Sequence, residues 1–386
     1  IIDKKSLVTC IDEESGIDQQ GYDQFAIDRY SDLTISQSSA VFGWGKEDTD
    51  TLKKIYPKNS HKIHKTGSPR VDLWKSFFSN YWTGLKRMPS KPFLLVSSNM
   101  ICTYFRPFHQ NIKILADAGY FQRDPELFKN RFYQWSEDYK KLLAFIEAIK
   151  YLSKNNNGYD IVLRPHPTED INAWKIFLKD IPNVHVIRED SITAWLKNAF
   201  AVMHNGCTTA FEATISGKPV ITYNPFKMEY SHNLANSLGF NIKSKEDLLI
   251  KANELFELSK IDNKKKEFQI SEEELFYKLY IDNNELASEK IIKIWESLDN
   301  NNLSKSNNWI NFYFYCKMVN LKEIFRKILG FLFPNKFKPF KENQKFPKLN
   351  ESDILSRVHR FQKIFGIKKK IKCKILSRKT ILIKSH

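Results

Sequence analysis

The sequence predicts an α/β protein built on a parallel sheet, and three observations support this class. Short apolar runs alternate with stretches of helical periodicity between residues 91 and 223. The connections between them are short, as they are in consecutive βαβ units. Polar clusters follow the apolar runs, and ligands of such sheets bind outside the carboxyl ends of the strands. We therefore expect buried strands covered by helices on both faces, with a binding site at one edge.

The expected elements follow in chain order. Strands are predicted at 91–98, 160–163, 184–187, 200–203 and 219–223, and helices at 135–153, 171–179, 191–198 and 206–216. Thr168 is expected to cap the helix at 171–179, with Glu169 and Asp170 in an acidic first turn. Gly217 is expected to end the helix before the last strand.

The domain prediction divides the chain at residues 66 and 299. Residues 1–66 hold only two β-like runs, at 6–11 and 41–44, and are interpreted as the end of a preceding domain. Residues 67–299 are predicted to form a second domain, closed by charged helices from residue 246 onward. The polar run 300–308 begins a linker and tail that reach residue 386. Because the chain starts with Ile1 and not Met, we expect that sequence precedes it.

Basic residues are concentrated at the carboxyl end. Residues 317–386 contain 20 Lys and Arg against four Asp and Glu, whereas the rest of the chain is almost neutral. The run 322–333 is predicted to be a cationic amphipathic helix, and lysines alternate with phenylalanines after it. We expect this tail to bind an anionic membrane surface. A nucleic-acid partner is not expected, because the neutral body offers no basic face, and a solvated basic tail is the simpler alternative.

Two further features limit the classes of protein to which the chain can belong. No run of about 18 apolar residues is present, so no membrane span is expected. The five cysteines lack metal-like spacing and are typical of free thiols in a reducing compartment.

The segment 164–167 is the first candidate site. Pro167 biases His166 toward extended geometry, and Arg164 and His166 are donors that suit a phosphate group. The alternative is a rigid turn that carries a surface histidine.

The segment 204–213 is the second candidate. Gly206 permits a close backbone approach, and the hydroxyls of Thr208 and Thr209 stand at a helix start that suits an anion. Glu212 is placed to bind a ribose hydroxyl. The alternative is a capping box formed by Thr209 and Glu212. Cys207 is interpreted as a small buried residue and not as a nucleophile.

Two acidic residues and a linker complete the candidates. Glu13 and Glu14 follow a β-like run and are hypothesised to supply a general acid or base, although solvated loop acids have the same pattern. In the segment 66–72, Arg70 and Asp72 either pair with each other or line a cleft.

Together these segments resemble the GT-B glycosyltransferase superfamily, in particular bacterial capsule and lipopolysaccharide biosynthesis proteins. The residues that carry the resemblance are 12–16 (DEESG), 44–45 (WG), 66–72 (TGSPRVD), 98–99 (SN), 164–169 (RPHPTE) and 204–219 (HNGCTTAFEATISGKP). The segment 164–167 resembles the His-Pro motif of bacterial sialyltransferases and of polyglycerol-phosphate polymerases.

The resemblance implies a metal-independent transferase with two Rossmann-like domains, the first of them incomplete in this chain, and no cofactor besides its nucleotide-sugar donor. A CMP- or CDP-linked donor is favoured. The donor-binding residues it implies are Arg164, His166, His204, Asn205, Gly206, Thr208, Thr209 and Glu212. Arg70 and Asn99 would line the cleft, and Glu13, Glu14 and His166 would be catalytic.

The implied acceptor is a glycan or lipid-linked chain at the inner, cytoplasmic face of the membrane, where the protein would be peripherally bound. A sugar-nucleotide epimerase, an alditol-phosphate transferase and a non-catalytic sugar-nucleotide-binding module are the alternatives.

Overall fold

The computed structural model divides the chain into two compact units. It describes residues 7–14, 22–82, 87–100, 108–117, 119–123, 125–227, 234–261, 272–299, 309–333, 350–377 and 380–385. From residue 6 onward, the first unit extends to Leu298 and the second from Asp299 to His386.

The main sheet of the first unit has six parallel strands in the order β6-β5-β4-β7-β8-β9. They are β4 (Phe93–Ser97), β5 (Asp160–Arg164), β6 (Val184–Val186), β7 (Ala201–His204), β8 (Val220–Tyr223) and β9 (Phe240–Ile242). The chain builds outward from β4 to β6, then returns to the other side of β4 and builds outward again. The topological switch point therefore lies between β4 and β7, which is where open α/β sheets bind ligands.

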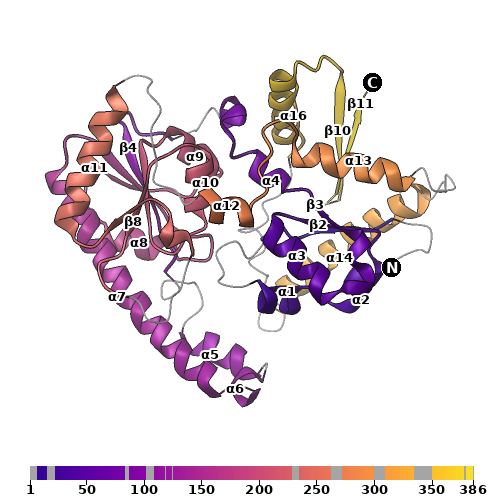
Figure 1. Ribbon diagram of the computed structural model, residues 1–386, viewed down its shortest axis with the longest axis horizontal. Coiled ribbons are helices and arrows are strands. Elements are labelled where there is room, and N and C mark those ends of the chain that lie inside the picture. The colour runs from indigo at the N-terminus through magenta and orange to yellow at the C-terminus, as the bar shows by residue number, and fades with distance from the viewer. Residues whose placement is uncertain are drawn as a thin grey trace. The chain divides into compact units, whose positions relative to one another are not determined.

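Helices cover both faces of this sheet (Figure 1). On one face, α7 (Pro125–Asn155), α8 (Ile171–Phe177) and α11 (Lys245–Lys260) pack around Phe145 and Trp174. On the other, α9 (Ile192–Asn198) and α10 (Thr209–Ile215) pack around Trp195 and Phe211. These four side chains are fully buried, and each such burial contributes about 1.5–3 kcal/mol.

Two helix starts differ from the prediction. Helix α7 begins ten residues early, at Pro125, because proline is well suited to the first helical position. The cap of α8 is Asp170, whose side chain accepts from the Asn172 N–H at 2.9 Å; the prediction of Thr168 was wrong. Helices α5 (Phe108–Asp117) and α6 (Tyr120–Arg123), which precede α7, were not predicted.

A second parallel sheet, of order β1-β2-β3, lies in the N-terminal part of the same unit. Its strands are β1 (Thr9–Ile11), β2 (Ala40–Gly43) and β3 (Ile63–Lys65), and its helices are α1 (Asp23–Arg29), α2 (Asp32–Gln37) and α3 (Lys46–Ile55). The predicted α/β class, with two parallel sheets, is confirmed.

The last helices of the first unit return to this small sheet. Helix α12 (Glu272–Lys278) lies against α3, and Ile291 of α13 (Ala287–Asp299) packs on Ala40 and Phe42. Trp295 Nε1 donates to Thr9 Oγ1 at 3.1 Å. The segment 272–298, which the sequence assigned to closing the second domain, thus completes the hydrophobic contacts of the small sheet β1-β2-β3.

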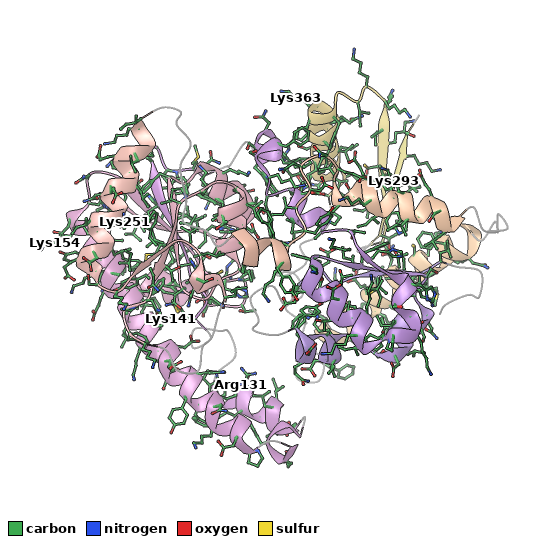
Figure 2. All side chains as sticks on the ribbon, in the orientation of Figure 1. Arg131, Lys141, Lys154, Lys251, Lys293 and Lys363 are labelled. Carbon is green, nitrogen blue, oxygen red and sulfur yellow. The ribbon has the colours of Figure 1, made fainter. Side chains whose placement is uncertain are left out.

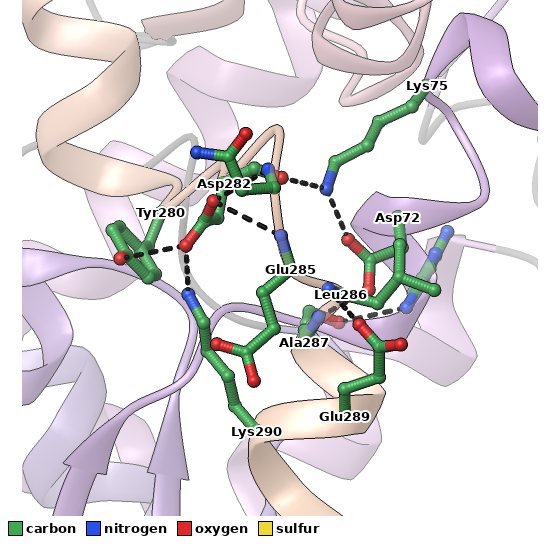
Figure 3. Close-up of polar contacts among 12 residues, drawn as sticks. Asp72, Lys75, Tyr280, Asp282, Glu285, Leu286, Ala287, Glu289 and Lys290 are labelled. Atoms are coloured by element: carbon green, nitrogen blue, oxygen red, sulfur yellow. Dashed lines mark hydrogen bonds and ion pairs between the residues drawn. The ribbon is translucent and has the colours of Figure 1, made fainter.

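Two crossing segments join the sheets, and polar contacts bind them together (Figure 3). Asp72, in α4 (Pro69–Asp72), accepts from Lys75 Nζ and from the Ala287 N–H, both at 2.6 Å. Lys75 also donates to the Asp282 carbonyl at 2.7 Å, and Lys290 Nζ lies 2.6 Å from the Asp282 carboxylate. The outgoing segment 66–75 and the returning segment 278–290 therefore form one bonded crossing.

The second unit combines helices with a hairpin. It contains α14 (Trp309–Leu332), α16 (Glu351–Phe365) and the antiparallel strands β10 (Ile371–Ser377) and β11 (Thr380–Ser385). The predicted amphipathic helix at 322–333 is the second half of α14, and the hairpin was not predicted. The predicted linker 300–308 and the lysines between 336 and 348 lie outside the described residues. None of the described helices has the length and apolar character needed to cross a bilayer.

Candidate active site at the carboxyl edge of the main sheet

A row of polar side chains crosses the carboxyl ends of four strands. The strand register pairs Arg164 with Ser97, Ser97 with His204, and His204 with Thr222. Because side chains alternate along a strand, these four share the face of Val162, Leu95 and Val202, which packs on α9 and α10. The apolar sheet therefore ends in a polar edge, and the switch point lies within it.

The loop that follows β4 is bonded to the loop that follows β5 through Glu169. This carboxylate is fully buried and accepts from Ser98 Oγ at 2.6 Å, from the Met100 N–H at 2.9 Å and from Trp174 Nε1 at 3.3 Å. It also accepts from the His166 N–H. The sequence analysis placed Glu169 in a helical first turn and missed this role. Glu169 fixes the position of the His166 backbone relative to β4.

The same loop is bonded to the turn that follows β7. Asn99 Nδ2 donates to the Gly206 carbonyl at 3.0 Å, and the Gly206 N–H donates to Asn236 Oδ1 at 2.7 Å. Gly206 has a φ of 69°, in the region that favours glycine. Asn205 Nδ2 donates to the Tyr223 carbonyl at 2.7 Å. The turn at 205–206 is thus held by its neighbours on both sides.

The imidazole of His166 is oriented by its own turn. Thr168 Oγ1 lies 2.7 Å from His166 Nδ1, and the Thr168 N–H donates to the same nitrogen at 3.3 Å. Since Nδ1 accepts, the proton of the neutral ring resides on Nε2. The side chain is half-buried and follows β5 at the edge of the sheet.

The two threonines predicted as a pair have different environments. Thr208 is exposed and is the N-cap residue of α10, yet its side chain makes no cap hydrogen bond. Thr209 is buried, and its hydroxyl lies 3.2 Å from Ser97 Oγ and 3.1 Å from Cys207 Sγ. Cys207 is buried, as expected, and burial raises the pKa of its thiol. Of the two hydroxyls, that of Thr208 is the one at the surface.

Arg164 is directed at protein backbone. Its Nη2 donates to the carbonyls of Arg188 at 3.2 Å and Asp190 at 2.9 Å, and its Nη1 donates to that of Glu189. Burial lowers the pKa of this guanidinium to about 10, and the group lies 5.6 Å from the centre of the Trp195 ring. Arg164 thereby holds the loop between β6 and α9.

His204 is fully buried in the row. Thr222 Oγ1 donates to the Leu238 carbonyl at 2.9 Å, so it accepts from His204 Nε2 at 3.0 Å. Nδ1 is buried and has no hydrogen-bond partner. Burial lowers the pKa of His204 to about 3, so the ring is neutral at physiological pH.

Glu212 connects the main sheet with the edge of the small sheet. Its carboxylate is buried and accepts from Thr193 Oγ1 at 2.9 Å, and it lies 3.4 Å from Arg70 Nη2. Arg70 Nη1 donates to the Glu13 carbonyl at 3.2 Å. Burial raises the pKa of Glu212, and the charge of Arg70 opposes that shift. Neither the capping box with Thr209 nor the pairing of Arg70 with Asp72 is formed.

The acidic segment after β1 has one buried member. The side chains of Glu13 and Glu14 are exposed, whereas Asp12 is buried and lies 2.6 Å from Arg29 Nη2. The Asp12 carbonyl accepts from Trp44 Nε1 at 2.6 Å, and the carboxylate Oδ2 has no hydrogen-bond partner. Sequence reasoning did not separate Asp12 from its neighbours, because periodicity does not reveal which acid of a cluster folds inward.

Lys141, on α7 (Figure 2), lies 2.7 Å from Asp138 and donates to the Asn99 carbonyl at 3.4 Å, which supports the loop after β4 from behind. Within the part of the chain that the structure describes, no group of His, Cys, Asp and Glu is arranged to hold a metal ion.

Comparisons with known proteins return structures and no sequence family. No protein-family model matches the chain, and no curated protein matches it. A Listeria monocytogenes protein assigned as a UDP-N-acetylglucosamine 2-epimerase has 14% identity and a TM-score of 0.43, over 78% of this chain and 71% of its own.

A wall teichoic acid polymerase, TagF, has 13% identity and a TM-score of 0.40, over 69% and 60% of the two chains. A UDP-GlcNAc 2-epimerase from Methanocaldococcus jannaschii has 17% identity and a TM-score of 0.38, over 69% and 64%. The chain thus spans less than two thirds of each of these last two proteins.

Proposed function

We propose that this protein is a glycosyltransferase that binds the phosphate groups of a nucleotide-sugar donor at the switch point of the main sheet. One observation carries the proposal: the loop after β4 is bonded through Glu169 to the His166 turn and through Asn99 to the Gly206 turn. Two candidate hydrogen-bond donors to a phosphate, His166 Nε2 and the Thr208 hydroxyl, thus belong to the two turns that are bonded to residues 98 and 99, at the edge where α/β sheets bind ligands.

The proposed roles follow from where each group lies and from the contacts that hold it. His166 Nε2 and Thr208 Oγ1 would donate to phosphate oxygens, and the Gly206 turn would allow the phosphate to approach the backbone. Arg164 is assigned to positioning the loop at 188–190, because its donors already bind carbonyls there. Hydrogen bonds from these side chains would stabilise the phosphate oxygens, and the proposal invokes neither a metal ion nor a further cofactor.

The proposed reaction breaks the bond between the anomeric carbon and the phosphate oxygen. The nucleotide leaves with the electron pair, its negative charge stabilised by His166 and Thr208, while an acceptor hydroxyl forms the new glycosidic bond. The hydroxyl proton would pass to a carboxylate at the edge of the small sheet. Glu13 and Glu14 are the proposed bases, and Asp12 joins them because it is buried with one carboxylate oxygen unpartnered.

The proposed donor is a CMP- or CDP-linked sugar, which rests on the resemblance of residues 164–167 to the His-Pro motif. The proposed acceptor is a bacterial surface glycan, or its lipid-linked precursor, at the inner face of the cytoplasmic membrane. An epimerase would use the same donor site without an acceptor, and an alditol-phosphate transferase would move a phosphoryl-linked unit.

Calorimetric titration with CMP, CDP and UDP tests the donor site. We expect a cytidine nucleotide to bind and His166→Ala to weaken binding about tenfold or more, since a hydrogen bond to a charged group contributes about 1.5–3 kcal/mol. His61→Ala, at an exposed histidine in η1 (Pro57–Lys62), is the matched control and should bind normally. Absence of binding by all three nucleotides would refute the proposal.

Measuring turnover alongside nucleotide affinity distinguishes the acceptor-side residues from those that bind the nucleotide-sugar donor. Substituting Asp12, Glu13 and Glu14 singly by Asn or Gln should leave nucleotide affinity unchanged, and at least one substitution should abolish transfer. If a purified nucleotide sugar is converted without any acceptor, the epimerase is the correct function. If the transferred unit retains a phosphate, the alditol-phosphate transferase is correct.

A further inference from the structure

The outward face of α14 carries a continuous apolar stripe. Six large side chains recur along the helix at alternating intervals of four and three residues, and each is between 49% and 64% exposed: Phe314, Met318, Leu321, Phe325, Ile328 and Leu332. This spacing places them on one side of the helix. We refer to these six residues as the α14 stripe.

The opposite side of α14 is the one that packs within its own unit. Cys316 is buried, and Asn320 Nδ2 donates to the Leu376 carbonyl of β10 at 3.1 Å. The helix is therefore amphipathic, but its more polar side packs against the hairpin and its apolar side is exposed, which is the reverse of a typical surface helix. An exposed apolar surface of this extent is typical of an interaction site.

The width of the apolar surface favours a lipid interface over a second helix. Ile324 and Phe331, which are 55% and 86% exposed, extend the surface beyond the α14 stripe on one side. A two-helix seam needs only the narrow row of alternating intervals. An interfacial membrane helix instead buries a broad apolar face that is rich in aromatic residues.

The positive charge of the tail favours an anionic lipid surface, and not a second copy of this chain, as the partner of the α14 stripe. Lys317 and Lys322 lie on either side of the α14 stripe, and both are exposed. The hairpin adds exposed Lys372 and Lys374, and Lys384 lies opposite Lys372 in the register. With a net charge of +16 in residues 317–386, two tails repel each other, whereas anionic lipids attract the tail.

We propose that the α14 stripe inserts into the interfacial region of an anionic lipid surface while Lys317 and Lys322, which flank the stripe, contact lipid headgroups. Insertion uses the apolar area that the fold leaves open, and the lysines contribute long-range attraction that salt screens. This inference is independent of the donor site, since it involves only residues of the second unit.

Vesicle flotation of the full chain, without nucleotide, tests the proposal. The protein should bind vesicles that contain phosphatidylglycerol and bind pure phosphatidylcholine weakly. The double variant F325S and I328S should lose about tenfold or more in affinity, because two large apolar side chains no longer insert. K317Q with K322Q should lose about fivefold per lysine at low salt, because these two lysines flank the stripe.

A matched double variant controls for the loss of exposed apolar area. Ile176 and Ile250, which are 72% and 65% exposed on the first unit, are replaced together by serine, and vesicle binding should be unchanged. Calorimetry should show that nucleotide affinity is the same in both double variants, so that failure here is distinct from failure of the donor site.

Three results would overturn the proposal. The first is equal vesicle binding by wild type and F325S/I328S. The second is a dimer in sedimentation that this double variant dissociates, with no vesicle binding, which would make the stripe an interface between copies. The third is tighter binding to an oligonucleotide than to anionic vesicles, lost on K317Q/K322Q.

Discussion

Two histidines at the ends of the strands that flank β4 have opposite environments. His166 follows β5, is half-buried and has Nδ1 held by its own turn, whereas His204 ends β7 and is fully buried. The sequence analysis gave both a place near the donor. The structure makes His166 a candidate for ligand contact and ties His204 to Thr222 of the neighbouring strand.

The burial of His204 predicts a dependence of stability on pH. The pKa of His204 is about 3 in the folded protein, against 6.5 for an ordinary histidine. Between these two pH values His204 is protonated in the unfolded chain and neutral in the folded protein. With respect to His204, the free energy of unfolding is highest above pH 6.5 and decreases as the pH falls toward 3. Between pH 7.5 and 5 the loss is about 2 kcal/mol.

Urea unfolding at these two pH values checks this prediction. His204→Asn keeps a side-chain donor near Thr222 but does not titrate. Its free energy of unfolding should fall by about 2 kcal/mol less than that of wild type over the same interval. Equal pH dependence of the two proteins would show that His204 is already protonated or accessible in the folded state.

At the scale of elements, the site is a junction of the loops that follow β4, β5 and β7, and Glu169 joins the first two of these loops. Its carboxylate accepts hydrogen bonds from the loop after β4, from the His166 turn and from α8. The sequence placed the three loops at one sheet edge but gave no sign of this bond. A glutamate in an acidic first turn and a glutamate in a buried junction have the same sequence pattern.

Glu169→Gln is expected to destabilise this junction. One of the two oxygens becomes an amide that faces donors, so at least one buried donor loses its acceptor, at a cost of about 2–3 kcal/mol. The midpoint of urea unfolding measures the loss, and nucleotide affinity should fall because the His166 turn is released. The control is Glu254→Gln, at a half-exposed residue of α11, which should change stability by about 0.5 kcal/mol or less.

At the scale of the whole first unit, the connection between the two sheets depends on the hydrogen bonds that join the segments 66–75 and 278–290. Gly67 has a φ of 79°, and a Cβ there would lie 2.7 Å from the Tyr280 carbonyl oxygen. Tyr280 in turn donates its N–H to the Trp44 carbonyl at 2.7 Å. The returning segment can approach the outgoing one this closely only because residue 67 has no side chain.

Gly67→Ala should therefore loosen the crossing. Gly217, with a φ of 68° and nothing within 4 Å of its Cβ position, is the matched control. Both alanines incur about 1–2 kcal/mol for the left-handed backbone, and Gly67→Ala should lose at least about 1 kcal/mol more. Hydrogen exchange should increase at 278–290 in Gly67→Ala alone; equal effects of the two substitutions would contradict the close approach.

The sequence alone determined the order of the strands β4–β8 and of the helices α7–α10 between them, the polar clusters at strand ends and the basic tail, because these depend on local periodicity and composition. The tertiary structure decided which members of each cluster are bonded to other parts of the protein. Thr209, Arg164 and His204 are bonded to Ser97, to the loop at 188–190 and to Thr222. Those partners come from distant segments that only the strand register brings together, so no local pattern records them.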